Sequence, residues 1–347
     1  MILLLPEYTV KKNVGLTVLS KAFLKEVEAI HRDTQSGAAK IAEECLNALM
    51  RECLRIINVL DGSILKTAIQ LLLDTHPMAT IENALLPIYV RLTQLLKSGR
   101  FKQGDPRATI NLVFSTHRDQ LRFCEKATIQ TLVGVLRRKD SILTFSHSST
   151  VIKAFLQLAR EGYQSKEIFV LESRPLNEGE RTAHSLANSG FKKVNLGIDF
   201  AVNEFIDQAE VAVFGADMVH SNGQILNKIG SATIAKLFHM QSKDVIVAAS
   251  SSKICLRGII NQDEDWHPVI SHHNPNEVTT ISSPNLEVWN KYFEIVQPKY
   301  ITSLIMDQHH FRAPIISDIT KFLKNETFSK RIEEIRNLWY NVDFTIV

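Results

Sequence analysis

The sequence predicts an α/β protein, with an N-terminal helical domain over residues 1–137 and a doubly wound parallel-sheet domain over residues 138–347. A change in periodicity leads to this prediction. From about residue 16 to 138 the apolar residues recur at helical spacing, whereas after Lys139 short apolar runs alternate with amphipathic segments. Apolar strands separated by helices are typical of a parallel sheet covered on both faces. The second half is therefore predicted to be Rossmann-like.

The first third of the chain is predicted to form a helical bundle. Two of its segments carry clear apolar stripes, and two longer segments, 79–99 and 115–139, continue the helical pattern. Pro87 is expected to kink or break the third helix, because proline lacks the amide hydrogen that a helix interior needs. The stripes are formed by Leu19, Phe23, Val27 and Ile30, and by Ile41, Cys45, Leu49 and Cys53.

The second half alternates strand-like and helix-like runs in order. The predicted strands are "SILTFS", "EIFVLES", "KKVNLGID", "VAVFGAD" and "DVIVAASS"; helical runs such as "STVIKAFLQLAREG" and "SATIAKLFHMQS" separate them. Residues 256–290 have no period and are predicted to form a long functional or interface loop. The tail, 315–347, returns to a helical pattern.

Composition favours a globular protein without a nucleic-acid or membrane-surface role. The chain has 347 residues, 45% hydrophobic and 22% charged, with a formal net charge of only +3. The four cysteines lack metal-ligand or disulfide spacing and are expected to be reduced, mostly buried thiols. The apolar run before Pro6 is too short for a signal peptide, and no run is long enough to span a membrane. We therefore expect a cytoplasmic protein.

Polar residues gather where three predicted strands end, which is where open α/β sheets bind their ligands. Ser146, His147, Ser148 and Ser149 follow the first strand and open a helix, so their hydroxyls and the free backbone amides could bind phosphate. The alternative is that Ser148 or Ser149 only caps that helix. Both interpretations remain open at this point.

The other two clusters follow the second and fourth strands. Arg174 offers a fork that fits phosphate or carboxylate, although a surface pair with Glu172 competes with that role. Asp217 ends an apolar strand and is followed by Asn227 and Lys228, so it could transfer protons; N-capping or turn formation is its alternative role. Burial would raise the pKa of Asp217 and Lys228 would oppose that shift. Three such clusters together predict a pocket for a small phosphorylated ligand.

Several other functions have weak support. The sequence lacks the glycine patterns of dinucleotide-binding and P-loop proteins, and we expect no cofactor. The adjacent pairs His272-His273 and His309-His310 cannot easily direct both imidazoles at one ion, so no metal site is expected. Trp266 is interpreted as an anchor for its own loop.

Four motifs in this order resemble one known family: "SILTFSHSSTV", "VLESRPLNEGERTA", "VFGADMVHSNGQILNKIGS" and "YFEIVQPKYITSLIMD". The chain is similar to the family that unites the alpha, beta and delta regulatory subunits of translation initiation factor 2B with methylthioribose-1-phosphate isomerase and ribose-1,5-bisphosphate isomerase. The resemblance is strong over about residues 138–315. It implies a helical domain, a Rossmann-like domain and dimerisation through the latter.

The resemblance also separates two branches of the family. The isomerases have a cysteine directly after the first strand, at the position of Ser146. Their phosphate-binding Arg-Gly-Ala segment has only Ser36-Gly37-Ala38 as its counterpart, without the arginine. Asp217 matches their catalytic aspartate, and Asn227 with Lys228 matches their Asn-Lys pair. A serine hydroxyl is much less acidic than a thiol and is a poor substitute in proton transfer.

The main hypothesis is therefore a regulatory-subunit-like member of the initiation factor 2B family. It would bind a sugar phosphate or nucleotide, assemble as a homodimer or with other subunits of that factor, and support guanine-nucleotide exchange on initiation factor 2. The alternative is an aldose–ketose isomerase of a phosphorylated ribose, with Asp217 as acid/base and Arg174, Asn227 and Lys228 holding the substrate. A third interpretation is a metabolite-binding homodimer without a role in translation.

Overall fold

The computed structural model describes residues 18–33, 36–261 and 272–340, and these residues form two compact units. One unit contains the described parts of residues 1–77, 84–118 and 334–347, and the other contains residues 78–83 and the described parts of 119–333. The predicted domain boundary at residue 137 remains a prediction.

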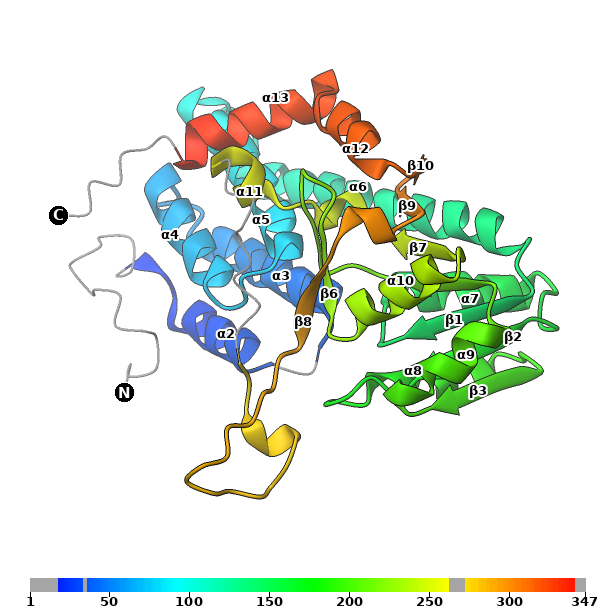
Figure 1. Cartoon of the computed structure of the whole chain (residues 1–347). Coiled ribbons are helices and arrows are strands. Elements are labelled where there is room, and N and C mark those ends of the chain that lie inside the picture. Colours follow the sequence, from blue (N-terminus) through cyan, green and yellow to red (C-terminus); the bar gives the residue numbers. More distant parts are fainter. Residues whose placement is uncertain (1–17, 34–35, 262–271, 341–347) are drawn as a thin grey trace. The chain divides into compact units, whose positions relative to one another are not determined.

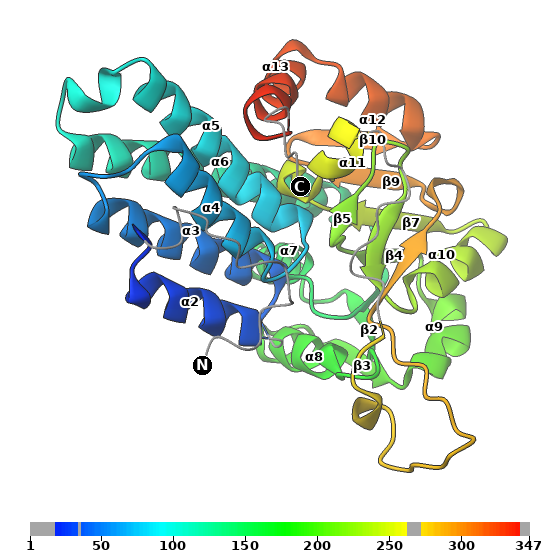
Figure 2. The same ribbon diagram turned by 90° about the vertical axis from the view of Figure 1, so that its left-hand side faces the viewer.

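The first unit is helical, as the apolar periodicity predicts. Its helices α2 (Lys21–Arg32), α3 (Ala38–Arg55) and α4 (Gly62–Leu73) follow one another as neighbours (Figure 2). Both predicted stripes are buried on α2 and α3. The Ser20 hydroxyl caps α2 and also donates 2.6 Å to the buried Glu52 carboxylate on α3, which ties the two helices together.

Two long helices, α5 (Ala79–Lys97) and α6 (Pro106–Leu136), contribute residues to both units, and a short 3-10 helix (Arg100–Lys102) lies between them. Helix α5 continues through Pro87, so the predicted break does not occur. Pro87 cannot donate to the Asn83 carbonyl four residues earlier. Arg331 Nη2 instead lies 3.5 Å from that carbonyl and partly replaces the missing donor.

The second unit is built on a seven-stranded sheet of order β10-β9-β7-β4-β1-β2-β3, parallel except for β10 (Figure 1). This order confirms the predicted doubly wound α/β fold. The strands are β1 (Ser141–Phe145), β2 (Glu167–Leu171), β3 (Lys193–Gly197), β4 (Val211–Phe214), β7 (Asp244–Ala248), β9 (Ser303–Met306) and β10 (His309–Arg312).

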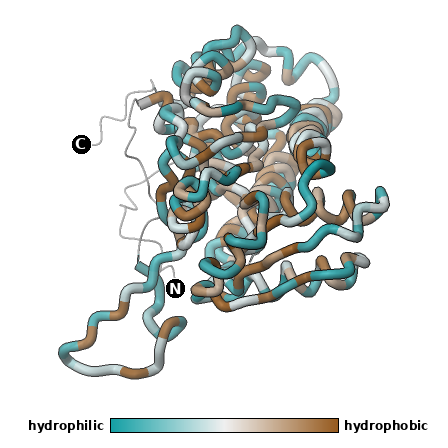
Figure 3. The backbone as a smooth tube through the Cα atoms, turned by 45° about the vertical axis from the view of Figure 1, so that its right-hand side comes forward, coloured by the Kyte–Doolittle hydropathy of each residue, from teal (hydrophilic) through white to brown (hydrophobic). Residues whose placement is uncertain are grey.

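Helices cover both faces of this sheet. Buried residues of α6, α7 (Ser149–Arg160) and α8 (Glu178–Asn188) pack on one face, and α9 (Val202–Gln208) and α10 (Ser231–Met240) contact strands from the other. Successive side chains of a strand point to opposite faces, so both faces need apolar residues. Strand β4 is accordingly apolar throughout, and the other central strands are apolar apart from Ser141, Thr144, Glu167 and Asp244. Figure 3 shows hydrophobic stretches along the backbone of this unit.

A second, three-stranded sheet was not predicted from the sequence. Strand β5 (Met218–Val219) pairs with β6 (Ile225–Lys228), which pairs in turn with β8 (Phe293–Val296), all antiparallel. The sequence "SNG" forms the turn of the β5–β6 hairpin, where His220 N donates 2.9 Å to Gln224 O. The hairpin carries Asn227 and Lys228 on a rigid strand instead of a loop.

The segment predicted as a long loop contains more structure than expected. Helix α11 (Leu256–Asn261) occupies its start because Leu256 and Ile260 are buried, and a 3-10 helix (Pro275–Glu277) lies further along. Trp266 lies outside the described residues. Residues 272–290 extend from their unit as an open loop (Figure 1).

The chain ends in helices α12 (Ile315–Leu323) and α13 (Glu326–Ile335), followed by a π-helical turn (Arg336–Tyr340) that belongs to the first unit. In that unit Trp339 is buried, with its ring 4.8 Å from that of Tyr89. In the described part of the chain, no helix combines the length and apolarity that crossing a membrane requires.

Candidate functional site

The ends of β1 and β2 are joined by a network of hydroxyl groups. Ser146 N donates to Ser173 Oγ at 2.6 Å, and the buried Thr182 on α8 donates to the Ser146 carbonyl at 2.6 Å. The His147 ring lies 3.1 Å from the same Thr182 hydroxyl. Burial lowers the pKa of His147, and nearby Arg181 lowers it further. The backbone that follows β1 is therefore held in one conformation by α8 and β2.

The ends of β1 and β4 also lie in close contact. A side chain at Gly215 would place its Cβ only 2.4 Å from Ser148 Oγ, so glycine is needed where the two strand ends meet. Ser148 is the N-cap of α7, with its hydroxyl 3.5 Å from Val151 N. The capping role considered from the sequence is thus present, and it positions Ser148 beside the loop that leads to Asp217.

Asp217 lies between β4 and the β5–β6 hairpin, where its amide donates 2.9 Å to Leu226 O. One third of its side chain is exposed, and Lys253 Nζ is 3.9 Å from its carboxylate. Burial raises the pKa of Asp217; Lys253 opposes this shift more than Lys228 does. Burial likewise lowers the pKa of Lys253, against the influence of Asp217. A carboxyl with a raised pKa beside a lysine can both accept and return a proton.

Lys228 makes a different contact from the one expected. Its ammonium lies 2.9 Å from the Glu178 carboxylate, and only 4% and 16% of the two side chains are exposed. Glu178 is the first residue of α8, whose first turn packs against the end of β2. Asn227, which precedes Lys228 on β6, donates 3.0 Å to Ser231 Oγ. Lys228 is therefore neutralised within the protein and is not a free cation.

Arg174 is positioned by its backbone more than by its side chain. Asp199, after β3, accepts hydrogen bonds from the amides of Ser173 and Arg174, both at 2.8 Å. The exposed Arg174 guanidinium donates 3.3 Å to the Val278 carbonyl instead of pairing with another residue of the predicted site. Arg174 thus links the end of β2 to the 272–290 loop.

The base of the 272–290 loop surrounds Lys228. The Lys228 ammonium lies 5.0 Å from the centre of the Tyr292 ring, and the His273 ring stacks on Tyr292 at 3.6 Å. The Tyr292 hydroxyl donates 2.5 Å to Glu277, and burial together with Glu277 raises the pKa of Tyr292. Aromatic and acidic groups therefore enclose Lys228 from two sides.

Sequence reasoning missed three residues at this site: Glu178, Asp199 and Lys253. Asp199 comes after the strand run "VNLG", and Lys253 comes after "AASS". The rule that ligand-binding residues follow strand ends therefore covers both of them. Glu178 lay inside a run interpreted only as a helix. Its pairing with Lys228 could not be inferred, since the hairpin was not predicted.

Three of the four thiols, those of Cys45, Cys53 and Cys124, are not activated. Burial raises the pKa of Cys45 and Cys53 to about 12 and that of Cys124 to about 11, so these groups stay protonated. Within the described ranges no group of three or more His, Cys, Asp or Glu side chains could hold a metal ion. Proton transfer by Asp217 is thus the chemistry that the site residues best support.

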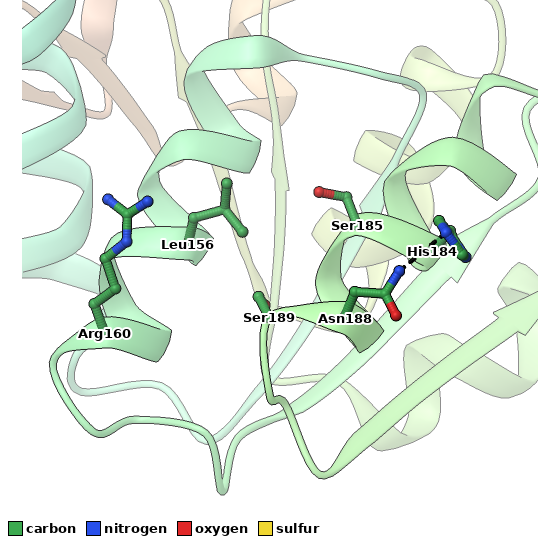
Figure 4. A pocket seen from close by; sticks show the side chains of 6 residues that line it. All are labelled: Leu156, Arg160, His184, Ser185, Asn188 and Ser189. Atoms are coloured by element: carbon green, nitrogen blue, oxygen red, sulfur yellow. Dashed lines mark hydrogen bonds between the residues drawn. The ribbon is translucent and has the colours of Figure 1, made fainter.

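A shallow groove elsewhere on the second unit is separate from this site. It is lined by residues of the last turns of α7 and α8 (Figure 4). These helix ends lie toward the amino ends of the strands, because each helix begins where a strand finishes. The lining residues are Leu156, Arg160, His184, Ser185, Asn188 and Ser189.

Comparison with known proteins gives consistent relatives. Residues 34–311 match the model of the initiation factor 2 subunit family. The ribose 1,5-bisphosphate isomerase of Thermococcus kodakarensis is 27% identical over 302 residues, covering 83% of this chain and 90% of that protein. The methylthioribose-1-phosphate isomerase of Carboxydothermus hydrogenoformans is 31% identical over 202 residues, covering 54% and 57%.

Solved structures share the fold at low sequence identity. The translation initiation factor eIF-2B of Pyrococcus horikoshii superposes with a TM-score of 0.66 at 21% identity, covering 87% of this chain and all of that one. The tetrameric eIF2B-beta2-delta2 complex of C. thermophilum contains a chain that superposes with a TM-score of 0.60 at 15% identity, covering 90% and 99%. Chains of this fold thus occur in oligomeric complexes.

Proposed function

The chain belongs to the initiation factor 2 subunit family, and within that family we propose that it is an aldose–ketose isomerase of a phosphorylated ribose. The observation that carries this proposal is Asp217, a carboxyl at a strand end whose pKa is raised and which has Lys253 3.9 Å away. The isomerase relatives, one of which aligns over 83% of this chain, support it further.

The proposed reaction needs ring opening and proton transfer. In the isomerisation of a ribose 1-phosphate the ring C1–O4 bond breaks and O4 takes a proton, a hydrogen leaves C2 and one is added at C1, and the C2 hydroxyl loses its proton to become the carbonyl. Substrate and product have the same composition, so no external oxidant or cofactor is required. Asp217 would accept and return the proton, with Lys253 stabilising its carboxylate form. The turn at Ser146–Ser149 would bind the phosphate, and Asn227 would orient the sugar.

A second candidate is favoured by Ser146. The resemblance places a cysteine there in the isomerases, and the serine leaves this chain without a thiol at the reacting position. On this basis the chain would be a cytoplasmic, regulatory-subunit-like protein that binds a sugar phosphate without converting it. It would act as a homodimer or with other initiation factor 2B subunits, and its protein partner would be initiation factor 2.

One experiment separates the two candidates. The purified chain is incubated with ribose 1,5-bisphosphate or methylthioribose 1-phosphate, and ketose formation is followed by carbon and phosphorus NMR. Turnover that Asp217→Asn abolishes would establish the isomerase. Thermal stabilisation by an unchanged ligand would instead support the regulatory protein, since a ligand that binds only the folded state raises its stability. If the chain neither binds nor converts any phosphorylated pentose, both candidate functions are contradicted.

A further inference from the structure

The charges at the site cancel. Two acids, Asp217 and Glu178, face two lysines, Lys253 and Lys228, and the pairs are 3.9 Å and 2.9 Å apart. A cleft that attracts a dianionic ligand by its field needs an excess of positive charge. This cluster has none, although Lys228 is a residue from which phosphate binding would be expected.

The main chain that carries Glu178 is fixed against the end of β2. A Cβ on the next residue, Gly179, would lie 1.8 Å from the Leu171 carbonyl oxygen, so the first turn of α8 is pressed against the end of β2. Gly179 N also donates 3.0 Å to the Glu172 carbonyl. These contacts hold the main chain at Glu178, and the carboxylate itself is held by Lys228, with only 16% of the Glu178 side chain exposed.

Lys228 is held equally firmly. It lies on β6, opposite Phe293 of β8 in the antiparallel ladder, with the Tyr292 ring on another side of its ammonium. Its side chain has 4% of its area exposed. A phosphate that approached Lys228 would meet the Glu178 carboxylate at short range, and two like charges in a partly buried site repel strongly.

We propose that Glu178 is a specificity-determining residue, which occupies Lys228 and makes the site select singly phosphorylated sugars over bisphosphorylated ones. This inference rests on the proposed binding of a phosphorylated sugar. One phosphate binds at the Ser146–Ser149 turn, and the Lys228–Glu178 pair receives the uncharged hydroxyl groups at the other end of the sugar. A hydroxyl can donate to Glu178 and accept from Lys228 at the same time.

The test compares probes that differ by one phosphate. Ribose 1-phosphate, ribose 5-phosphate and ribose 1,5-bisphosphate are titrated calorimetrically into the full chain and into Glu178→Gln. The natural chain is expected to bind a monophosphate at least as tightly as the bisphosphate. Glu178→Gln is expected to raise bisphosphate affinity by about tenfold or more, with monophosphate affinity changed by less than about threefold.

Two control variants distinguish the charge from general effects. Glu180→Gln removes an exposed acid of the same helix turn, and Glu178→Asp keeps the charge at the site; both should retain the natural preference. Circular dichroism confirms that every variant is folded. A tenfold preference of the natural chain for the bisphosphate, or an equal change for all three probes in Glu178→Gln, would overturn the proposal.

A failure of the proposed function can be recognised separately. If no pentose phosphate binds to any variant, the sugar-phosphate function is wrong, and pyrophosphate then tests Glu178 alone. Stabilisation by pyrophosphate in Glu178→Gln but not in the natural chain would still identify Glu178 as the residue that excludes a second phosphate. Equal melting temperatures in pyrophosphate would refute that role.

Discussion

The Lys228 ammonium and the Glu178 carboxylate lie 2.9 Å apart with little of either side chain exposed, and they join the β5–β6 hairpin to the first turn of α8. Such a pair is costly to break from one side, because the remaining charge is left buried without a partner. The pair therefore fixes the geometry of the site as well as its charge.

Removing only one partner should destabilise the second unit. We expect Lys228→Met to lower the free energy of unfolding by about 3 kcal/mol, and Glu178→Leu combined with Lys228→Met to recover most of that loss. Urea unfolding monitored by circular dichroism measures both. Arg137→Met, which breaks the exposed pair with Glu161, is the matched control and should leave the free energy of unfolding nearly unchanged. A double variant as unstable as Lys228→Met would show that the pair itself does not explain the loss.

The close approach of α8 to β2 gives a prediction about Gly179. Gly179→Ala would place a methyl group 1.8 Å from the Leu171 carbonyl oxygen, and neither backbone can yield without moving the helix. We expect destabilisation of more than about 3 kcal/mol, measured by thermal and urea unfolding. Gly134→Ala in α6 meets nothing within 4 Å and should stabilise by up to about 1 kcal/mol. Similar melting temperatures for the two variants would contradict the packing described for α8.

A buried glutamate outside the site predicts a pH dependence of stability. Glu82 is 3% exposed, Arg257 Nε is 3.3 Å from Oε1, and Oε2 has no hydrogen-bond partner. Burial raises the pKa of Glu82 from 4.5 to about 7. The folded state then binds a proton that the unfolded state releases above pH 4.5, so this group makes stability fall as pH rises from 4.5 to about 7.

Glu82→Gln should remove that fall. Relative to the natural chain, the variant should have similar stability at pH 4.5 and be more stable at pH 8, by on the order of 3 kcal/mol. Urea unfolding across this range measures the difference. Parallel pH profiles for the two proteins would mean that Glu82 is ionised in the folded state at all these pH values.

The sequence was sufficient to locate the strand ends but not their partners. Apolar runs such as 211–214 predict buried parallel strands. The polar residues that come after these runs are predicted to bind a ligand, because open α/β sheets bind ligands at the carboxyl ends of their strands. The pairing of β6 with β8 could not be predicted from the sequence, because the register of a short strand depends on contacts with a distant segment and not on the strand's own pattern. From the sequence alone Lys228 is therefore expected to hold the substrate, and nothing in the sequence indicates that Lys253 is the partner of Asp217.

Asp217 gives a further prediction about pH. Burial raises its pKa above the ordinary 3.8, so this group contributes stability at low pH that declines as pH rises from 3.8 toward the raised value. Asp217→Asn should therefore be more stable than the natural chain at neutral pH, by up to about 1 kcal/mol, because solvent screens the one-third exposed side chain.

The same variant should lose any isomerase activity. Melting temperatures between about pH 3.5 and pH 8 measure the change in stability, and NMR of the sugar phosphates measures the loss of turnover. A variant that gains stability at neutral pH and keeps full turnover would remove Asp217 from the proposed acid/base role while leaving the description of its burial intact.

Ser146 provides the sharpest test of the chemistry at the site. Its amide is held by Ser173 and its carbonyl by Thr182, so Ser146→Cys should leave the backbone unchanged and put a thiol at the end of β1. A thiol has a pKa near 8.5 and is a far better proton donor and acceptor than a hydroxyl at neutral pH. We expect turnover of a phosphorylated ribose to rise by about one to two orders of magnitude. Ser185→Cys, in the groove at the ends of α7 and α8 that is separate from the site, is the control and should not change the rate. If Ser146→Cys binds the sugar phosphate as the natural chain does but gains no turnover, then the pocket is a binding site and the regulatory function is the one to pursue.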